Sequence, residues 1–461
     1  MPKPYDFGRV EIDVEPGAVK SVAAPDSETP FRILATGDFT GRASRGLPAH
    51  RPKPVFIDRD NFDQVMARLA PSLRLESADR REIALTFRDL DDFHPDRLFE
   101  KLDLFRSLRQ LRDQLHDPEL FRETAEQLQA PPARTAKAPE AASLSSGSLL
   151  DDMIEATETR SPKARRSDPV QDYVRQIVAP HIVPKANPKQ AEMIAQVDAA
   201  ISAEMRSLLH HPKFQALESA WRSLFLLVRN VETSSQLKIF LLDLTKPELA
   251  SGVIDQLIDI AGDEPWSLVV ADETFGRAGD LKLLSNMGKL ARKAGAAFLA
   301  AADPSALGSD EWEALRSTPQ ASYIGLAMPR VLLRLPYGKQ NAETEQFDFE
   351  ELPESKHKAY LWGNPAFACA TLVAEAFSSE GWEMRPGQFQ EISGLPIHTY
   401  TDDGETKMKP CAEVWLTQRE VELLLEQGIM PLISMKNSDH VRVGRIQSIR
   451  TGAVPLAGRW T

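Results

Sequence analysis

The stretch that decides the fold is Leu208–Val228, LLHHPKFQALESAWRSLFLLV. Its apolar residues recur at three- and four-residue steps, which predicts a helix with one broad apolar stripe; they are Phe214, Leu217, Trp221, Leu224, Phe225 and Val228. Pro212 stands where a proline favours the start of a helix. The same period occurs upstream, at Ile194, Val197, Ile201, Met205 and Leu208. The sequence therefore predicts two amphipathic helices joined by a His-His-Pro corner, on which other elements pack.

Size and composition limit the classes of protein to consider. A chain of 461 residues is too long for one ordinary core, so two or three domains are expected. The formal net charge of −12 argues against nucleic acid or an anionic membrane as the main partner. Two cysteines, Cys369 and Cys411, make neither a disulfide framework nor a metal set and favour a reducing cytoplasm. No apolar run long enough to span a bilayer occurs, so no membrane insertion is expected.

The first region of the chain predicts a small α/β unit behind an N-terminal arm. Residues 1–29 are rich in Pro, Asp and Glu, and we expect them to be extended. Residues 30–128 then alternate between strand and helix patterns. The expected elements are strands at 31–35, 55–57 and 81–87, a helix over 62–69, and a longer helix that Pro95 opens and that runs to Leu115.

Composition changes after this unit. Residues 129–189 contain Pro-, Ala- and Ser-rich stretches that bury too little apolar surface to order themselves, which predicts a linker. Within it, Ser148–Glu158 (SLLDDMIEATE) predicts a short helix whose apolar face consists of Leu149, Leu150, Met153 and Ile154. Periodicity alone leaves two interpretations open. The face is a docking peptide for another protein, or it folds back on its own domain.

Residues 190–461 predict a second α/β domain. Buried strand patterns at 234–245, 266–275 and 295–304 alternate with helix patterns at 249–261 and 281–294. This alternation is typical of a mainly parallel sheet. Further helices are expected at 362–377 and 418–427. The fold class is thus α/β, with two α/β domains joined by a partly disordered linker.

Acidic residues supply the first candidate chemistry. Asp38 follows a buried strand, where α/β enzymes often carry a catalytic acid, but in GDFTG it is expected to bind its own turn backbone. Asp92–Asp96 (DFHPD) combines carboxylates with His94 and resembles an acid/base cluster. Because this cluster lies at a helix start, capping by Asp is the favoured role.

The remaining candidates are weaker still. His210 and His211 are adjacent and point in different directions on a helix, which favours a capping or loop role over a metal pair. Gly338-Lys339 lacks the other residues of a phosphate loop, and Gly276 with Gly279 lacks the third glycine of a dinucleotide fingerprint. We therefore expect no metal, no cofactor and no catalytic site, so that the protein is not an enzyme.

Several separated motifs resemble known families. GDFTGR (Gly37–Arg42), PVFIDRDNFDQVMARLAPSL (Pro54–Leu73) and LTFRDLDDFHPDRL (Leu85–Leu98) are similar to the small contractile-sheath subunit of bacterial type VI secretion systems, the TssB or VipA family. LHHPKFQALESAWRSL (Leu209–Leu224), VLLRLPYG (Val331–Gly338), LWGNPAFACA (Leu361–Ala370), GLPIHTY (Gly394–Tyr400) and EVWLTQREVELLLEQGIMPL (Glu413–Leu432) are similar to the large subunit, TssC or VipB. The chain thus resembles both sheath subunits fused head to tail.

The resemblance implies a structural function in the bacterial cytoplasm. Sheath subunits assemble with one another around an inner tube (an Hcp-like protein) and on baseplate components, and contraction of the sheath drives effector delivery. A ClpV-type AAA+ unfoldase recognises a helix at the place that Ser148–Glu158 occupies here. The resemblance therefore implies that Leu149, Leu150, Met153 and Ile154 form an unfoldase-docking face.

The resemblance also contains departures that keep alternatives open. Large subunits of the family continue beyond the point that corresponds to Thr461, so the second domain is expected to be truncated at its C-terminus. The small subunit's last strand corresponds to Pro/Ala-rich linker here. One alternative is a non-contractile, sheath-like adaptor or regulator that binds an unfoldase. A weaker one is an α/β enzyme that uses Asp38 or the Asp92–Asp96 cluster.

Overall fold

The computed structural model describes residues 25–47, 53–76, 82–129, 190–251, 264–353, 357–402 and 404–460. The chain forms two compact units. The sheet unit takes the residues up to 93, 210–337 and those from 352 onward, and the helical unit takes 94–209 and 338–351. Each unit combines segments from both of the regions, 30–128 and 190–461, that the sequence separates. The packing boundaries therefore differ from the boundaries drawn from composition.

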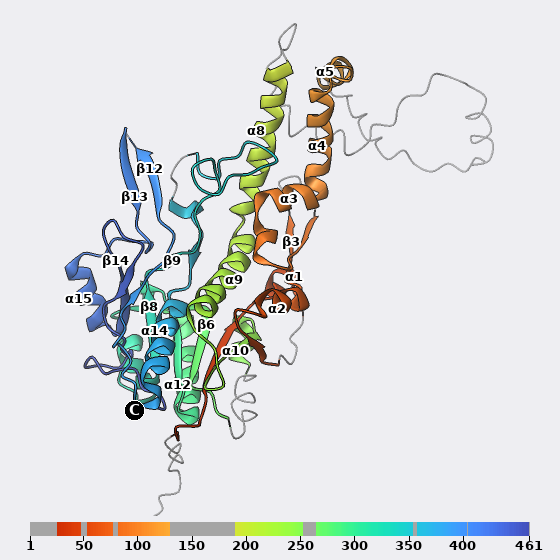
Figure 1. The fold of residues 1–461 in the computed structure, drawn as a ribbon. Helices are drawn as coiled ribbons and strands as arrows, with labels where there is room; N and C mark the ends of the chain where they lie inside the picture. Colours follow the sequence, from red (N-terminus) through yellow and green to blue (C-terminus); the bar gives the residue numbers. More distant parts are fainter. Residues whose placement is uncertain are drawn as a thin grey trace, which may run out of the picture. The chain divides into compact units, whose positions relative to one another are not determined.

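A nine-stranded sheet forms the centre of the sheet unit, in keeping with the α/β class that the sequence predicts (Figure 1). Its six middle strands are parallel, and antiparallel strands flank them on both sides. In spatial order, the strands are β11 (Glu391–Ile392), β15 (Val441–Val443), β14 (Ile429–Ser434), β8 (Ile324–Met328), β7 (Ala297–Ala302), β6 (Leu268–Phe275), β1 (Phe31–Gly37), β5 (Leu237–Asp243) and β2 (Val55–Ile57).

Strand β1 lies between β5 and β6, about 200 residues away in sequence. Phe31 pairs with Leu237 of β5, and Ile33 pairs with Leu268 of β6, both in parallel. Apolar side chains of β1 are buried on both faces of the sheet, as in the interior of parallel sheets. The three strands predicted in the second region are confirmed, but β5 and β6 are not neighbours because β1 separates them.

Helices cover both faces of the sheet. Leu34 of β1 belongs to a buried cluster with residues of α12 (Leu281–Ala294) and α13 (Asp310–Arg316). Phe31, on the opposite face of the same strand, packs against Phe377 of α14 (Pro365–Glu380) with ring centroids 4.7 Å apart. Helix α9 (Pro212–Asn230) packs beside α14. Alternate residues of one strand thus face different helical layers.

Helix α9 has the scaffold role that its apolar stripe predicts. Trp221 is fully buried, contacts the rings of Phe39 and Phe62 edge-on, and donates its indole N–H to the Phe39 carbonyl at 2.7 Å. Pro212 is the first residue of the helix, as expected. The helix therefore connects the segment after β1 to the layer beside the sheet.

Shorter elements complete the sheet unit. The remaining helices of the unit are α1 (Arg42–Arg45), α2 (Phe62–Leu69), α10 (Lys246–Ala250) and α15 (Gln418–Glu426). Three two-stranded sheets pair β3 (Ser72–Glu76) with β4 (Glu82–Thr86), β9 (Val331–Leu332) with β10 (Trp362–Gly363), and β12 (His398–Asp402) with β13 (Glu405–Lys409). The 3-10 turns are η1 (Leu90–Phe93), η3 (Ala278–Asp280), η4 (Pro304–Ala306), η5 (Pro319–Tyr323), η6 (His357–Ala359) and η7 (Gly381–Glu383).

The helical unit contains α3 (Pro95–Lys101), α4 (Asp103–His116), α5 (Phe121–Gln129) and α8 (Gln190–Leu209). Helices α4 and α8 run side by side (Figure 1), and Arg112 pairs with Asp198 across them at 2.7 Å. The prediction of a single helix from Pro95 to Leu115 is wrong, because the structure has two helices there. Leu102 adopts an extended conformation and divides it into α3 and α4.

Candidate functional site

The expected docking face lies outside the described residues. Leu149, Leu150, Met153 and Ile154 all fall within 130–189, so their role as a partner-binding surface stays a prediction. The sites that the structure does describe are the carboxyl end of the parallel strands, the predicted capping clusters and two surface regions.

The GDFTGR segment turns sharply after β1. The Asp38 carboxylate accepts hydrogen bonds from the backbone N–H groups of Arg42 at 2.7 Å and Ala43 at 2.9 Å. Thr40 donates its backbone N–H and its hydroxyl to Asp243 at the end of β5, at 2.9 and 2.7 Å. Asp38 is therefore a turn residue bound to its own backbone, and Thr40 links β1 to β5.

Arg42 extends this link into a buried ionic network. Its guanidinium pairs with Glu248 of α10 and lies 3.6 Å from Asp243, and all three residues are less than 9% exposed. Glu248 also closes a capping box with Thr245. Burial raises the pKa of Asp243, whereas in Glu248 the bonds from Thr245 and Arg42 outweigh burial and lower the pKa. The network holds the connection after β1 against β5 and α10, which is a structural role.

A bulge in β6 brings further carboxylates to the carboxyl end of the parallel strands. Three residues, Ala271–Glu273, stand opposite the single residue Ala300 of β7. Burial and the neighbouring Glu273 raise the pKa of Asp272 well above its ordinary value. Burial also raises the pKa of Glu273 to about 7, with Asp38 and Asp280 adding to the effect and Lys246 opposing it. Sequence reasoning missed these two residues, because a bulge depends on how two strands pair.

Asn364 holds the bulge in place. Its side-chain amide donates to the carbonyls of Ala271 at 3.2 Å and Glu273 at 3.4 Å, while its side-chain oxygen caps α14 by accepting from the Ala366 N–H at 2.9 Å. The helix expected at 362–377 therefore starts at Pro365, because Asn364 is its N-cap and Trp362 belongs to β10. The motif LWGNPAFACA thus has a packing role.

In the described part of the chain, the bulge carboxylates do not belong to a metal-holding group. Lys246 pairs with Asp280 at 2.9 Å and donates to the Thr274 carbonyl at 2.7 Å, so its charge is already engaged. Across the described residues, no group of three or more His, Cys, Asp or Glu side chains is arranged to hold a metal ion. Lys246 thus balances carboxylate charge within the fold.

The DFHPD cluster divides between the two units. Asp92, in the sheet unit, is buried and accepts from the Arg88 N–H at 2.8 Å. In the helical unit, the cap of α3 is His94, whose Nδ1 accepts from the Asp96 N–H at 3.3 Å, and Asp96 accepts from the backbone of Glu345 at 2.9 Å. Capping was expected, but from Asp. The reason is that Pro95 occupies the first helical position, which makes the preceding histidine the cap.

The other predicted candidates also have structural roles. His211 caps α9 by accepting from the Lys213 N–H at 3.2 Å, and burial, with Lys213, lowers its pKa. Lys339 pairs with Asp348 at 3.3 Å. Gly276 has a φ of +126°, and a Cβ there would lie 2.2 Å from the Asp303 carbonyl, so a close backbone approach requires this glycine.

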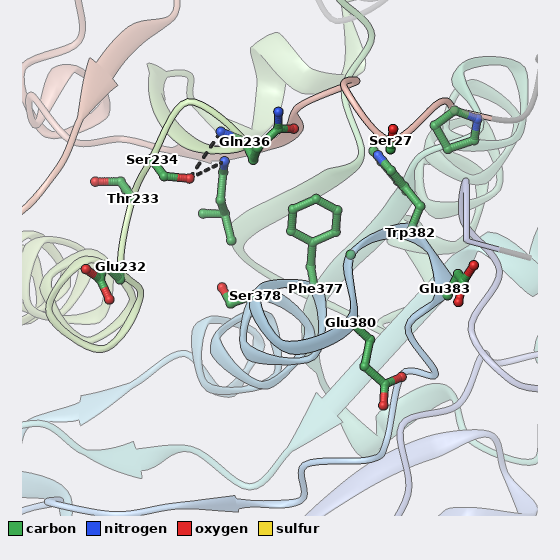
Figure 2. Close-up of a pocket in the computed structure, with 13 residues that line it drawn as sticks. Ser27, Glu232, Thr233, Ser234, Gln236, Phe377, Ser378, Glu380, Trp382 and Glu383 are labelled. Carbon is green, nitrogen blue, oxygen red and sulfur yellow. Dashed lines mark hydrogen bonds between the residues drawn. The ribbon is translucent and has the colours of Figure 1, made fainter.

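A hollow of about 650 Å³ lies beside the start of β5 (Figure 2). Its walls combine the Phe377 and Trp382 rings with polar groups, including Ser234, whose hydroxyl accepts from the backbone N–H groups of Gln236 and Leu237. Trp382 donates to the Thr29 carbonyl at 2.8 Å. Ser234 and Trp382 on these walls thus bind the protein's own backbone.

Several exposed apolar side chains lie within or just before α15 in the sequence. Val414 is 48% exposed, Trp415 47% and Leu423 51%, and no residue of α15 is fully buried. Large exposed apolar side chains are typical of contact surfaces when they lie together. This region is the structure's candidate for contact with another protein.

The fold is of the α/β class, and comparison with known proteins identifies the family of the chain. A sequence model described as "EvpB/VC_A0108, tail sheath N-terminal domain" (VipB) matches residues 191–318 and 309–450, which together exceed half of the chain. A model described as "Type VI secretion system, VipA, VC_A0107 or Hcp2" matches residues 7–130. The chain belongs to the VipB tail-sheath family and carries a VipA-type segment ahead of it, as the sequence motifs predict.

A relative found by sequence agrees with this family. The chain is 34% identical over 305 residues to the type VI secretion system sheath protein TssC1 of Pseudomonas aeruginosa, a match that covers 57% of this chain and 61% of TssC1. The chain also shares 14% sequence identity with the cryo-EM structure of the anti-feeding prophage baseplate, with 50% of each chain covered and a TM-score of 0.29. Among the described residues, no helix has the length and apolarity needed to cross a membrane.

Proposed function

We propose that this chain is a structural component of a bacterial type VI contractile sheath. In this proposal it assembles with its own copies in the cytoplasm, around an Hcp-like inner tube and on baseplate components, to drive effector delivery. It acts by packing and not by catalysis, without a cofactor. Because the chain spans 61% of the length of TssC1, this assignment to the whole assembly is an inference from the family.

One observation carries the proposal: β1 of the VipA-matching segment lies between β5 and β6 of the VipB-matching segment. The two sheath-family segments thus contribute to one sheet. The Arg42–Glu248 pair, which is buried, adds a second link between the same segments. A fused chain with this shared sheet can therefore supply both sheath-subunit segments of the assembly in one polypeptide.

Electron microscopy of the purified chain tests the assembly. We expect tubes or rings, formed either by the chain alone or after addition of the inner-tube protein. A chain that stays monomeric with every other secretion component present contradicts the contractile proposal. The adaptor alternative then remains, provided that the chain still binds an unfoldase.

A surface variant sharpens this test. Trp415→Ser removes an apolar side chain that is 47% exposed, so it should reduce tube or ring formation while leaving the melting temperature nearly unchanged. Glu422→Ser, a change at an exposed residue of α15, is the matched control and should assemble normally. Equal assembly by both variants removes this surface from the proposal.

We also propose that Leu149, Leu150, Met153 and Ile154 dock a ClpV-type unfoldase. Met153→Asp places a charge on the apolar face and should weaken binding of a 145–160 peptide by roughly tenfold or more, because that charge must be buried. Ser148→Asp adds the same charge to the opposite face of the expected helix and is the control. Fluorescence anisotropy with purified unfoldase measures both, and equal affinities exclude this docking face.

A further inference from the structure

A lysine, a histidine and a glutamate form a chain of contacts at the end of β13, beside η6. The Lys409 ammonium nitrogen lies 2.9 Å from Nδ1 of His357, and Nε2 of the same ring lies 3.4 Å from Glu413. Arg330 holds Glu413 through two bonds of 2.8 and 2.6 Å. We call Lys409, His357 and Glu413 the Lys409 cluster.

These contacts suit one tautomer of His357. When Nε2 carries the proton and donates it to Glu413, the lone pair of Nδ1 faces Lys409. A carboxylate that orients a histidine beside a nucleophile is the general arrangement by which proteins activate weak nucleophiles. Here the nucleophile is an amine, which reacts only after it loses a proton.

Burial and ring contacts act on the Lys409 amine in opposite directions, because the face of an aromatic ring attracts the ammonium form and burial disfavours it. Its nitrogen lies over the rings of Tyr360 at 4.9 Å and Trp362 at 5.9 Å, which are almost completely buried. Burial lowers the pKa of Lys409, against the opposing charge of Glu413. Burial also acts on Glu413, but Arg330 and His357 outweigh it and lower the pKa of that carboxyl. Glu413 therefore stays ionised and can hold an imidazolium.

We propose that Lys409 is a nucleophilic modification site that accepts an acyl group from an activated acyl donor, an acyl phosphate or a thioester. His357 acts as the base, and Glu413 is its positioning residue. The His357 side chain is 43% exposed, so a donor reaches the cluster from solvent. This inference does not rest on the sheath function.

The reaction balances within the cluster, the donor and solvent. The Lys409 ammonium first releases one proton to solvent. The neutral amine then attacks the acyl carbon, and a nitrogen–carbon bond forms. The bond from that carbon to the phosphate oxygen or thiolate sulfur breaks, and the leaving group takes the electron pair. One amine proton passes to Nδ1 of His357. The product is an uncharged amide, which removes the positive charge from above the Tyr360 and Trp362 rings.

Site-resolved mass spectrometry of the full chain tests the proposal. The chain is incubated with limiting acetyl phosphate in one arm and acetyl-coenzyme A in the other, and acetylation of Lys409 is compared with that of exposed Lys436. We expect Lys409 to react at least about tenfold faster in one arm, a modest share of what general-base assistance supplies. The reactive arm identifies the donor. Equal rates at both lysines in both arms overturn the proposal.

Two variants separate assistance by the cluster from simple exposure. His357→Gln should lower the Lys409 rate about tenfold and leave the Lys436 rate unchanged, and Glu413→Gln should lower it less. His440→Gln is the control, because His440 is equally exposed and lies beside Asp439. An unchanged Lys409 rate in His357→Gln contradicts the proposal.

The wild-type chain provides a test that does not depend on how the variants fold. Lys409 acetylation should reach half of its maximal rate at a lower pH than Lys436 acetylation. Coincident pH profiles for the two lysines also overturn the proposal.

Discussion

Glu273 occupies the bulge of β6, where burial and the Asp38 and Asp280 carboxylates raise its pKa to about 7. An ordinary glutamate in the unfolded chain has a pKa near 4.5. The folded protein therefore binds more protons than the unfolded chain between these two values. The raised pKa of Glu273 therefore adds most to the free energy of unfolding of the protein below pH 4.5. This contribution is lost as the pH rises through about 7.

Glu273→Gln removes this pH dependence. At pH 8 the variant should be about 1 to 3 kcal/mol more stable than the wild type, and at pH 4.5 nearly equal to it, because glutamine needs no desolvated charge. Urea unfolding followed by tryptophan fluorescence at both pH values measures the difference. Glu232→Gln, at an exposed residue, should show no such change. A variant less stable than wild type at pH 8 would mean that the charge of Glu273 supports the fold.

At the residue scale, the sequence predicts roles that depend on neighbours in the chain. Asp38 is a turn residue as expected, because its partners are four and five residues away. The cap formed by His211 agrees with the capping or loop role expected for it, and the cap formed by His94 could have been found from Pro95, which follows it. Asp272 and Glu273 could not, because their surroundings depend on the pairing of β6 with β7 and on Asn364.

Helix α14 shows how one side chain connects two elements. Asn364 caps this helix and also donates to two carbonyls of the β6 bulge. A lost cap alone costs about 1 kcal/mol, and buried carbonyls left without a donor cost more.

Asn364→Ala should therefore lower the free energy of unfolding by about 2 to 4 kcal/mol. Thr417→Ala removes only the cap of the exposed helix α15, and we expect a loss of about 1 kcal/mol or less. Chemical denaturation of the two variants gives the comparison. Equal losses would show that the bonds from Asn364 to the bulge contribute nothing to stability.

Elements follow from the sequence more reliably than their partners do. Helix α12 has the bounds that its apolar pattern predicts, 281–294. The pattern of Phe31–Ala35 correctly indicates a buried strand. That pattern carries no information about which strands it pairs with, because parallel pairing over such a separation in sequence depends on tertiary packing.

At the scale of the whole molecule, the central feature is that the two sheath-family segments share one sheet. Separating β1 from the sheet would expose Phe31, Ile33 and Leu34 to solvent. These side chains are at most 1% exposed in the folded chain. Each such side chain contributes about 1.5 to 3 kcal/mol on burial. The connection through residues 130–189 should therefore not be needed to hold the segments together once the chain has folded.

Cleavage of that connection tests this claim most directly. A specific protease site is placed between residues 130 and 147, the folded chain is cut, and the products are analysed by gel filtration in native buffer. The uncut chain and a chain without the site, both treated with the protease, are the controls. We predict that the two fragments elute together and keep the near-ultraviolet circular dichroism of the intact chain. Fragments that elute separately while each stays folded would contradict the account.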